Sequence, residues 1–183
     1  MIILITGASH TGKTFLAKKF VEKYHYSCLS IDHLKMGLIR SGYTDLTPLD
    51  DDKLTDYLWP VVKEMIKTAI ENNQDMIVEG CYVPATWQKD FDEQYLFSIR
   101  LICLAFTEEY IEKNFDNIIS NASVIEKRLC DDLTKEVLIR DNRQFLEGFG
   151  QQVTLIEDSY EQTVDSLLQD WRGKDYGKNR RSI

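Results

Sequence analysis

The sequence has few cysteines, fewer basic than acidic residues and no long apolar run, and each of these features excludes a class of protein. Its four cysteines among 183 residues show neither C-x-x-C spacing nor the density of a disulfide framework, so structural zinc and disulfide bonds are not expected. The three histidines form no metal-ligand pattern. A net charge of −8 disfavours nucleic acids and anionic membranes as partners, because these recruit proteins through clustered lysine and arginine.

The apolar segments are too short for a membrane anchor or a leader. No stretch reaches the roughly 18 apolar residues of a membrane-spanning helix. The run at residues 2–5 lacks a basic flank and is too short for a signal-peptide core. We therefore expect a cytoplasmic protein, monomeric or homodimeric, with a single domain at residues 1–172. The basic tail at residues 173–183 lacks apolar periodicity, and we expect it to be disordered.

Apolar runs typical of strands alternate with helical patterns along the chain. Strands are predicted at residues 2–6, 27–31, 75–79, 100–106 and 152–156, and helices at 15–24, 32–41, 53–72, 107–118, 133–148 and 160–171. Pro60 should bend the third of these helices, and a further helix should follow the loop at residues 80–84. Such alternation is typical of α/β proteins, in which helices cover both faces of a parallel sheet.

One motif matches a phosphate-binding loop of the form G-x-x-x-x-G-K-[ST]. It follows a buried-type strand and opens a helix, which is the context such a loop requires. Its glycines let backbone N–H groups surround an anion, and the helix N-terminus favours negative charge. The alternative is a glycine-rich turn with a solvated lysine. The predicted ATP-binding residues are Gly7, Ala8, Ser9, His10, Thr11, Gly12, Lys13 and Thr14, with Lys13 directed to the phosphates and Thr14 to Mg²⁺.

Two carboxylates follow predicted strands at the edge where open α/β sheets bind ligands. Asp32 comes after Ile31 at the end of the second strand, where it can accept a proton from a substrate hydroxyl or hold Mg²⁺ through water. Its alternative role is to cap a helix beginning at His33. Glu79 ends the third strand, where an acid can organise the magnesium shell, and Gly80 allows a ligand to approach the backbone. The alternative for Glu79 is a solvated strand end.

Four arginines are candidates for contacts with anions. Arg128, Arg140 and Arg143 fall in the helical region after the fourth strand, where cations can close over a transferring phosphoryl group. Arg140 and Arg143 are three residues apart and share one helix face. Arg40 lies one helix beyond Asp32 and can hold an anionic acceptor. Ordinary solvated surface arginines are the alternative for all four.

With these motifs the chain resembles the P-loop small-molecule kinases, a group that includes adenylate kinase-like, shikimate kinase-like and zeta-toxin-like enzymes. The segments at residues 30–32 and 78–84 look most like those of 2-phosphoglycerate kinase-like proteins. The resemblance implies a three-layer P-loop fold with strand order 2-3-1-4-5, and ATP with Mg²⁺ on the glycine loop. It also implies an acceptor pocket near Asp32, Arg40 and Glu79, and a helical lid at about residues 107–148. The third strand ends in a glutamate where the family carries an aspartate.

The leading interpretation is Mg²⁺-dependent phosphoryl transfer from ATP to a small-molecule acceptor, at a hydroxyl or a phosphate. Asp32 then serves as base or metal organiser, and binding and positioning supply most of the catalysis. The alternative is a nucleotide-binding regulatory or switch module with little or no acceptor phosphorylation. The chain lacks the extra segments expected of a large motor, which favours the kinase. Nothing in the candidate pocket selects a nucleobase over a sugar or an acid.

Overall fold

The computed structural model describes residues 1–125 and 133–173. Its strands form a parallel sheet in the order β2-β3-β1-β4-β5, which confirms the predicted fold class and strand order. The strands are β1 (Ile2–Gly7), β2 (Ser27–Ser30), β3 (Met76–Glu79), β4 (Ile99–Phe106) and β5 (Val153–Ile156). Because β1 pairs with both β3 and β4, the predicted phosphate-binding loop leaves the sheet from its centre.

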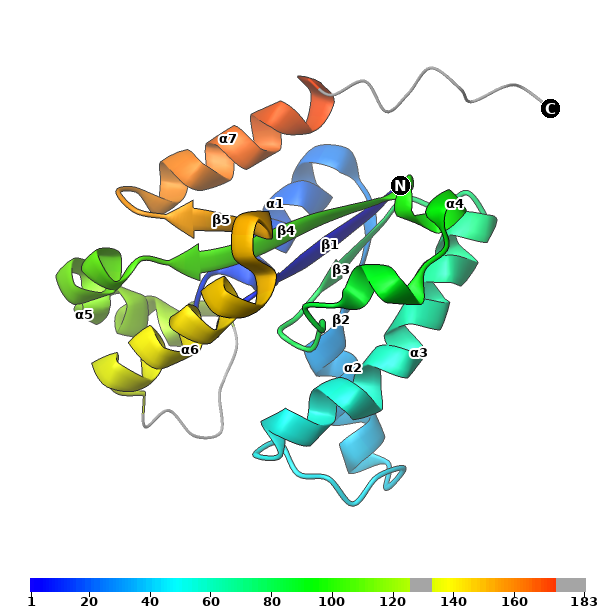
Figure 1. The fold of residues 1–183 in the computed structure, drawn as a ribbon, viewed down its shortest axis with the longest axis horizontal. Coiled ribbons are helices and arrows are strands. Elements are labelled where there is room, and N and C mark those ends of the chain that lie inside the picture. The colour runs from blue at the N-terminus through cyan, green and yellow to red at the C-terminus, as the bar shows by residue number, and fades with distance from the viewer. Residues whose placement is uncertain (126–132, 174–183) are drawn as a thin grey trace.

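Helices cover both faces of this sheet (Figure 1). They are α1 (Lys13–Tyr24), α2 (Ile31–Arg40), α3 (Asp51–Glu71), α4 (Glu93–Leu96), α5 (Glu108–Ile125), α6 (Lys135–Phe149) and α7 (Tyr160–Gly173), with short 3₁₀ turns η1 (Trp87–Asp90) and η2 (Gly150–Gln152). Successive side chains of a strand face opposite ways, so Ile2 packs with α2 and α3 while Ile3 packs with α1 and α7. All of β1 is buried, as its continuous apolar run predicts.

The segment after β3 departs from the prediction of a further helix. The chain forms only η1 and the single-turn α4 there. Trp87 and Trp59 each lie 6.1 Å, centroid to centroid, from the ring of Phe91. Asp90 accepts hydrogen bonds from Trp59 Nε1 (2.9 Å) and Lys63 Nζ (2.8 Å) on α3. These tertiary contacts hold the segment in short turns against α3, and local helical preference does not override them.

The helix α3 continues through Pro60 from Asp51 to Glu71. Leu58 and Val62 on either side of the proline are fully buried, so packing against the sheet offsets the lost backbone donor. The bend expected at Pro60 stays a prediction. Across residues 1–125 and 133–173, no helix combines the length and the apolarity needed to cross a bilayer.

The region predicted as a lid contains α5 and α6, and both helices pack on the sheet. Ile111 and Leu138 are fully buried. Asn142 on α6 is 1% exposed, and its Oδ1 accepts a hydrogen bond from the backbone N–H of Phe106 at 2.8 Å. Its Nδ2 donates to the carbonyl oxygen of Leu138, also at 2.8 Å. These bonds anchor α6 at the end of β4. Arg128 lies outside the described residues.

Candidate active site

The lysine of the phosphate-binding loop is buried within the loop. Lys13, the first residue of α1, is 8% exposed, and its Nζ donates a hydrogen bond to the carbonyl oxygen of Ala8 at 2.8 Å. Thr11 Oγ1 donates to the same oxygen at 2.7 Å. The loop is therefore ordered by its own side chains, and the alternative of a solvated Lys13 is wrong. Phosphate oxygens accept stronger hydrogen bonds from an ammonium than a neutral carbonyl does, so Lys13 can exchange one for the other.

The start of α1 is fixed from the far end of the chain. Gly12 is the N-cap of α1 in a left-handed conformation (φ 75°), and a Cβ at this position would collide with the ring and hydroxyl of Tyr160. Tyr160 begins α7 and donates a hydrogen bond from its hydroxyl to the carbonyl oxygen of Gly12 at 2.8 Å. Burial raises the pKa of Tyr160, so the hydroxyl remains a donor. The sequence did not single out Tyr160, because a tyrosine that follows the last strand is equally typical of a core-packing residue.

Glu79 is buried against the loop at the end of β3. It is 1% exposed, and its Oε2 accepts a hydrogen bond from Thr14 Oγ1 at 3.1 Å. The alternative of a solvated strand end is therefore wrong. Burial raises the pKa of Glu79, and Ser30, Lys13 and Thr14 offset part of that rise. Glu79 Oε1 and Ser30 Oγ are both buried, and neither makes a hydrogen bond of standard geometry among the described residues.

The oxygen atoms around Thr14 and Glu79 suit a magnesium ion. Mg²⁺ takes hard oxygen ligands and commonly binds one or two protein groups together with substrate phosphates and waters. The buried Glu79 carboxylate, beside the Thr14 hydroxyl in the first turn of α1, fits that requirement. The described residues hold no cluster of three or more His, Cys, Asp or Glu side chains able to bind a metal by themselves. A bound Mg²⁺ would therefore depend on phosphate oxygens for much of its coordination.

Asp32 lies in the first turn of α2, because β2 ends at Ser30 and the helix begins at Ile31. The alternative role of Asp32 as the cap of a helix beginning at His33 is therefore wrong, because Ser30 is the N-cap of α2. Ser30 pairs in register with Glu79 on the neighbouring strand, and the charge of Asp32 raises the pKa of Glu79. The two predicted acids therefore lie together at the carboxyl edge of the sheet.

Gly80 brings α2 close to the end of β3. Its φ is 155°, and a Cβ there would lie 2.8 Å from the Cβ of Ile31. The space beside Gly80 is therefore filled by Ile31 of α2. The expectation that a ligand approaches the backbone there is wrong. This close packing places Asp32, the next residue of α2, beside Glu79.

Lys35 and Tyr82 complete the surroundings of Asp32. Lys35 Nζ donates hydrogen bonds to Asp32 Oδ1 and to the hydroxyl oxygen of Tyr82, both at 2.7 Å. The side chain of Lys35 is 12% exposed, whereas that of Asp32 is 31% exposed. Sequence reasoning missed both partners. The spacing of three residues from Asp32 to Lys35 on one helix was the available signal.

The structure does not bring the predicted arginines to the loop through any contact of the described residues. Arg40 is exposed at the last position of α2, about 12 Å along the helix from Asp32 at the usual rise. Arg140 pairs with Asp141 at 2.9 Å and Arg143 with Glu108 at 3.1 Å, and their side chains are 64% and 62% exposed. Arg140 and Arg143 thus use different acids, although they share a helix. Their roles stay predictions.

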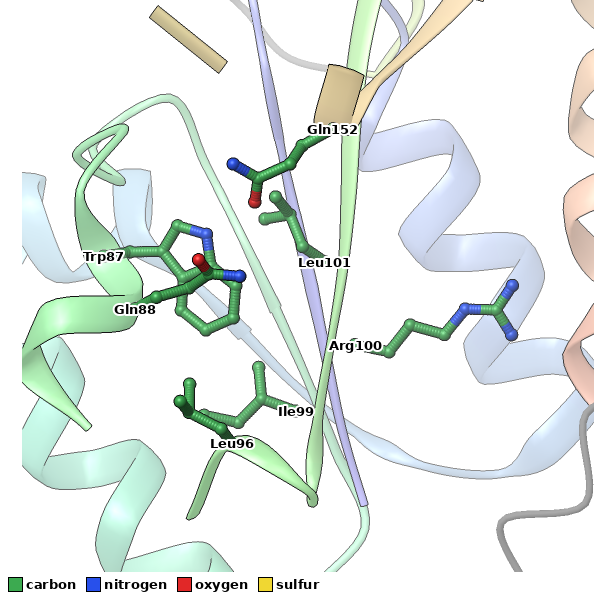
Figure 2. Close-up of a pocket in the computed structure, with 7 residues that line it drawn as sticks. All are labelled: Trp87, Gln88, Leu96, Ile99, Arg100, Leu101 and Gln152. Atoms are coloured by element: carbon green, nitrogen blue, oxygen red, sulfur yellow. The ribbon is translucent and has the colours of Figure 1, made fainter. Parts of the chain in front are cut away.

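A separate pocket of about 290 Å³ opens at the other end of the sheet. It lies where β4 begins and is lined by Trp87, Gln88, Leu96, Ile99, Arg100, Leu101 and Gln152. Figure 2 shows the side chain of Arg100 directed away from the other six. Ile99 pairs with Ile2 at the start of β1, whereas Leu104 pairs with Gly7 at its end. The pocket is therefore distant from the phosphate-binding loop.

Solved structures similar to this one include kinases and an uncharacterized protein. A sugar kinase from Janibacter sp. superposes with a TM-score of 0.54 at 14% identity, covering 92% of each chain. A gluconokinase from Sinorhizobium meliloti gives 0.52 at 12% identity, over 94% of this chain and 96% of its own. An uncharacterized protein from Eubacterium ventriosum gives 0.53 at 11% identity, over 95% and 99%. No protein-family model and no curated protein sequence matches the chain. At these identities the likeness shows the fold, which is that of P-loop small-molecule kinases.

Proposed function

We propose that this protein is a Mg²⁺-dependent phosphotransferase that moves the γ-phosphoryl group of ATP to a hydroxyl of a small-molecule acceptor. The observation that carries the proposal is the hydrogen bond from Thr14 Oγ1 to Glu79 Oε2, at 3.1 Å. It joins the phosphate-binding loop to a buried acid on the neighbouring strand. Asp32, on the acceptor side, lies close enough for its charge to raise the pKa of Glu79.

The loop at residues 7–14 binds the phosphates of the nucleotide in this proposal. Its backbone N–H groups and Lys13 bind the phosphates, and the Thr14 hydroxyl and Glu79 carboxylate would hold Mg²⁺. When bound, the ion neutralises charge on the β- and γ-phosphates. Burial of these groups matters, because a buried cation acts on a phosphate far more strongly than one in water.

Exposure assigns different roles to the two acids. Glu79 is 1% exposed and lies beneath Thr14, so an acceptor hydroxyl has little access to it. The side chain of Asp32 is 31% exposed, so a substrate can reach it. We therefore assign Glu79 to the metal and Asp32 to the acceptor. Asp32 takes the proton of the acceptor hydroxyl, the hydroxyl oxygen bonds to the γ-phosphorus, and the bond from that phosphorus to the β–γ bridging oxygen breaks to release ADP.

The exposed arginines of α6 are proposed to assist at the transferring group. Arg140 and Arg143 make ion pairs at the surface, and such pairs contribute only about 0–1 kcal/mol. Exchanging either pair for a phosphate therefore costs little. Arg40 is proposed to contact a distal part of a longer acceptor, because it stands at the far end of α2 from Asp32.

Measurement of ADP release across sugars, phospho-acids, nucleosides and nucleotides tests the proposal. At least one acceptor should stimulate release, and Asp32→Asn should lower that stimulation about 100- to 10,000-fold, to a residual rate, while nucleotide binding persists. Asp56→Asn, which removes an exposed carboxylate of α3, is the matched control and should retain full activity. Nucleotide binding with no acceptor dependence across the whole panel would instead support the regulatory module.

A further inference from the structure

Three side chains connect the acceptor helix to the loop that follows β3. Lys35 of α2 donates to Asp32 Oδ1 on one side and to the hydroxyl oxygen of Tyr82 on the other, at 2.7 Å each. Its Nζ also lies 4.9 Å from the centre of the Tyr82 ring. Tyr82 itself is 3% exposed and belongs to the core between the sheet and α3. Asp32 is thus tied, through Lys35, to a residue that cannot move freely.

The burial of Lys35 sets this ion pair apart from surface pairs of the same kind. The side chain of Lys35 is 12% exposed, whereas those of Lys113 and Glu109 on α5 are 68% and 75% exposed. An exposed pair holds its side chains weakly, because water competes for every hydrogen bond. A lysine with little access to water must instead keep its donors on protein acceptors. The buried Lys35 therefore holds the Asp32 carboxylate in one orientation.

Only one oxygen of Asp32 is engaged in this way. Lys35 occupies Oδ1, and within the described residues no hydrogen bond reaches Oδ2. A carboxylate held by one oxygen can present the other in a fixed direction. Such orientation by a neighbour matters for proton transfer, which requires heavy atoms within about 2.6–3.2 Å.

We infer that Lys35 is a positioning residue for phosphoryl transfer. It holds Asp32 through Oδ1 so that Oδ2 faces the acceptor hydroxyl, and Tyr82 holds Lys35. The inference rests on the proposed function, because it assigns Lys35 a task in the same reaction. Lys35 acts through Asp32 and has no separate contact with ATP. The rate of transfer should therefore depend on Lys35, while nucleotide binding should not.

Steady-state kinetics of Lys35→Met, Lys35→Arg and Tyr82→Phe test this assignment. Lys35→Met should lower kcat about 10- to 100-fold, as loss of an orienting partner does, with little change in the ATP dissociation constant or the acceptor KM. Lys35→Arg keeps a cation beside Asp32 and should recover part of kcat. Tyr82→Phe should lower kcat less than Lys35→Met. Lys67→Met is the matched control, because Lys67 also pairs with an acid three residues away and lies near tyrosine, but on α3.

A double variant separates positioning from direct contact. In an Asp32→Asn background, Lys35→Met should cause no further loss, because two residues that act as a unit are not additive. A multiplied loss, or an acceptor KM that rises as kcat holds, would overturn the inference in favour of substrate contact. Equal kcat for wild type and Lys35→Met would overturn it while leaving the proposed function intact. If the wild type itself shows no acceptor-dependent ADP release, the proposed function fails and the inference fails with it.

Discussion

The phosphate-binding loop and the α6 arginines present their positive charges in opposite ways. Lys13 is 8% exposed and hydrogen-bonded inside its own loop, whereas the side chains of Arg140 and Arg143 are more than 60% exposed at the surface. The loop is also joined to β3 through Glu79 and to α7 through Tyr160. A group already held in place loses little freedom when its ligand binds, while an exposed side chain must be ordered first. The comparison indicates that the proposed nucleotide-binding loop is organised in advance and that the α6 arginines are not.

The largest effect on activity is expected from removing the positive charge of Lys13 in the glycine loop. Lys13→Ala should lower acceptor-dependent ADP release at least about 100-fold, because the phosphates lose their buried cation. Isothermal titration should also show weaker ATP binding. Lys19→Ala, on an exposed face of the same helix, should change neither quantity. A Lys13→Ala protein with wild-type turnover would contradict the proposed role of the loop.

Glu79→Gln should lower activity about 10- to 100-fold and raise the Mg²⁺ concentration needed for half-maximal rate. The amide keeps the shape of the side chain and can still accept from Thr14, but it loses the charge proposed to attract the ion. A magnesium titration of the rate measures the effect, with Glu22→Gln as the exposed control on α1. An unchanged magnesium requirement would remove Glu79 from the metal site.

The same variant should change how stability depends on pH. The pKa of Glu79 is raised above its usual 4.5, chiefly by burial, so the folded state favours the protonated carboxyl. The stabilisation due to that proton is complete below the unfolded pKa and is lost as pH rises through the folded pKa. Without Mg²⁺, Glu79→Gln should therefore have a higher Tm than wild type at pH 7, and the difference should shrink toward pH 4. A difference that grows on acidification would show that the buried carboxylate is stabilising.

A smaller effect is expected at the contact between α7 and the loop. Tyr160→Phe removes the hydroxyl that donates to Gly12, and a hydrogen bond of this kind contributes about 0.5–1.5 kcal/mol. ATP binding should weaken about 2- to 10-fold, with the acceptor KM unchanged. Tyr95→Phe removes a hydroxyl bonded to Glu71 on the exposed surface and should leave ATP affinity as it is. Equal ATP affinity in Tyr160→Phe and wild type would show that the loop is organised without Tyr160.

The smallest effect on stability is expected at the exposed region. Arg143→Ala should change the free energy of unfolding by less than about 0.5 kcal/mol, because its pair with Glu108 is solvated. Chemical denaturation measures this change. A severalfold loss of kcat at unchanged stability would place Arg143 in the reaction. Loss of stability above 1 kcal/mol, on the order of that of a buried contact, would contradict the contrast between the two regions.

The parts of the fold and of the site that are set by residues adjacent in sequence were predictable from the sequence. The strand, glycine loop and helix at the N-terminus follow from a local pattern, and the position of Glu79 at a strand end follows from the apolar run before it. The order of the strands came with the resemblance to P-loop kinases. The further helix predicted after the loop at residues 80–84 is reduced to the short turns η1 and α4, because contacts to Trp59 and Lys63 on α3 outweigh local preference.

Contacts between distant segments were not predictable. Lys35 and Tyr82 are 47 positions apart, and no local pattern in either segment predicts their contact. The burial of Glu79 depends on α2 packing over Gly80, which the sequence of β3 does not specify. Residue type thus indicated which groups could act at this site, and only the folded arrangement indicated what holds them.

The bond from Tyr160 to Gly12 spans 148 positions, and this span bears on how the protein is made. The glycine loop leaves the ribosome well before the tyrosine that supports it. Domains form as units during synthesis, so a nascent chain that ends before residue 160 holds a loop without its support. Nucleotide capture in its mature form should therefore begin only after the start of α7 has emerged.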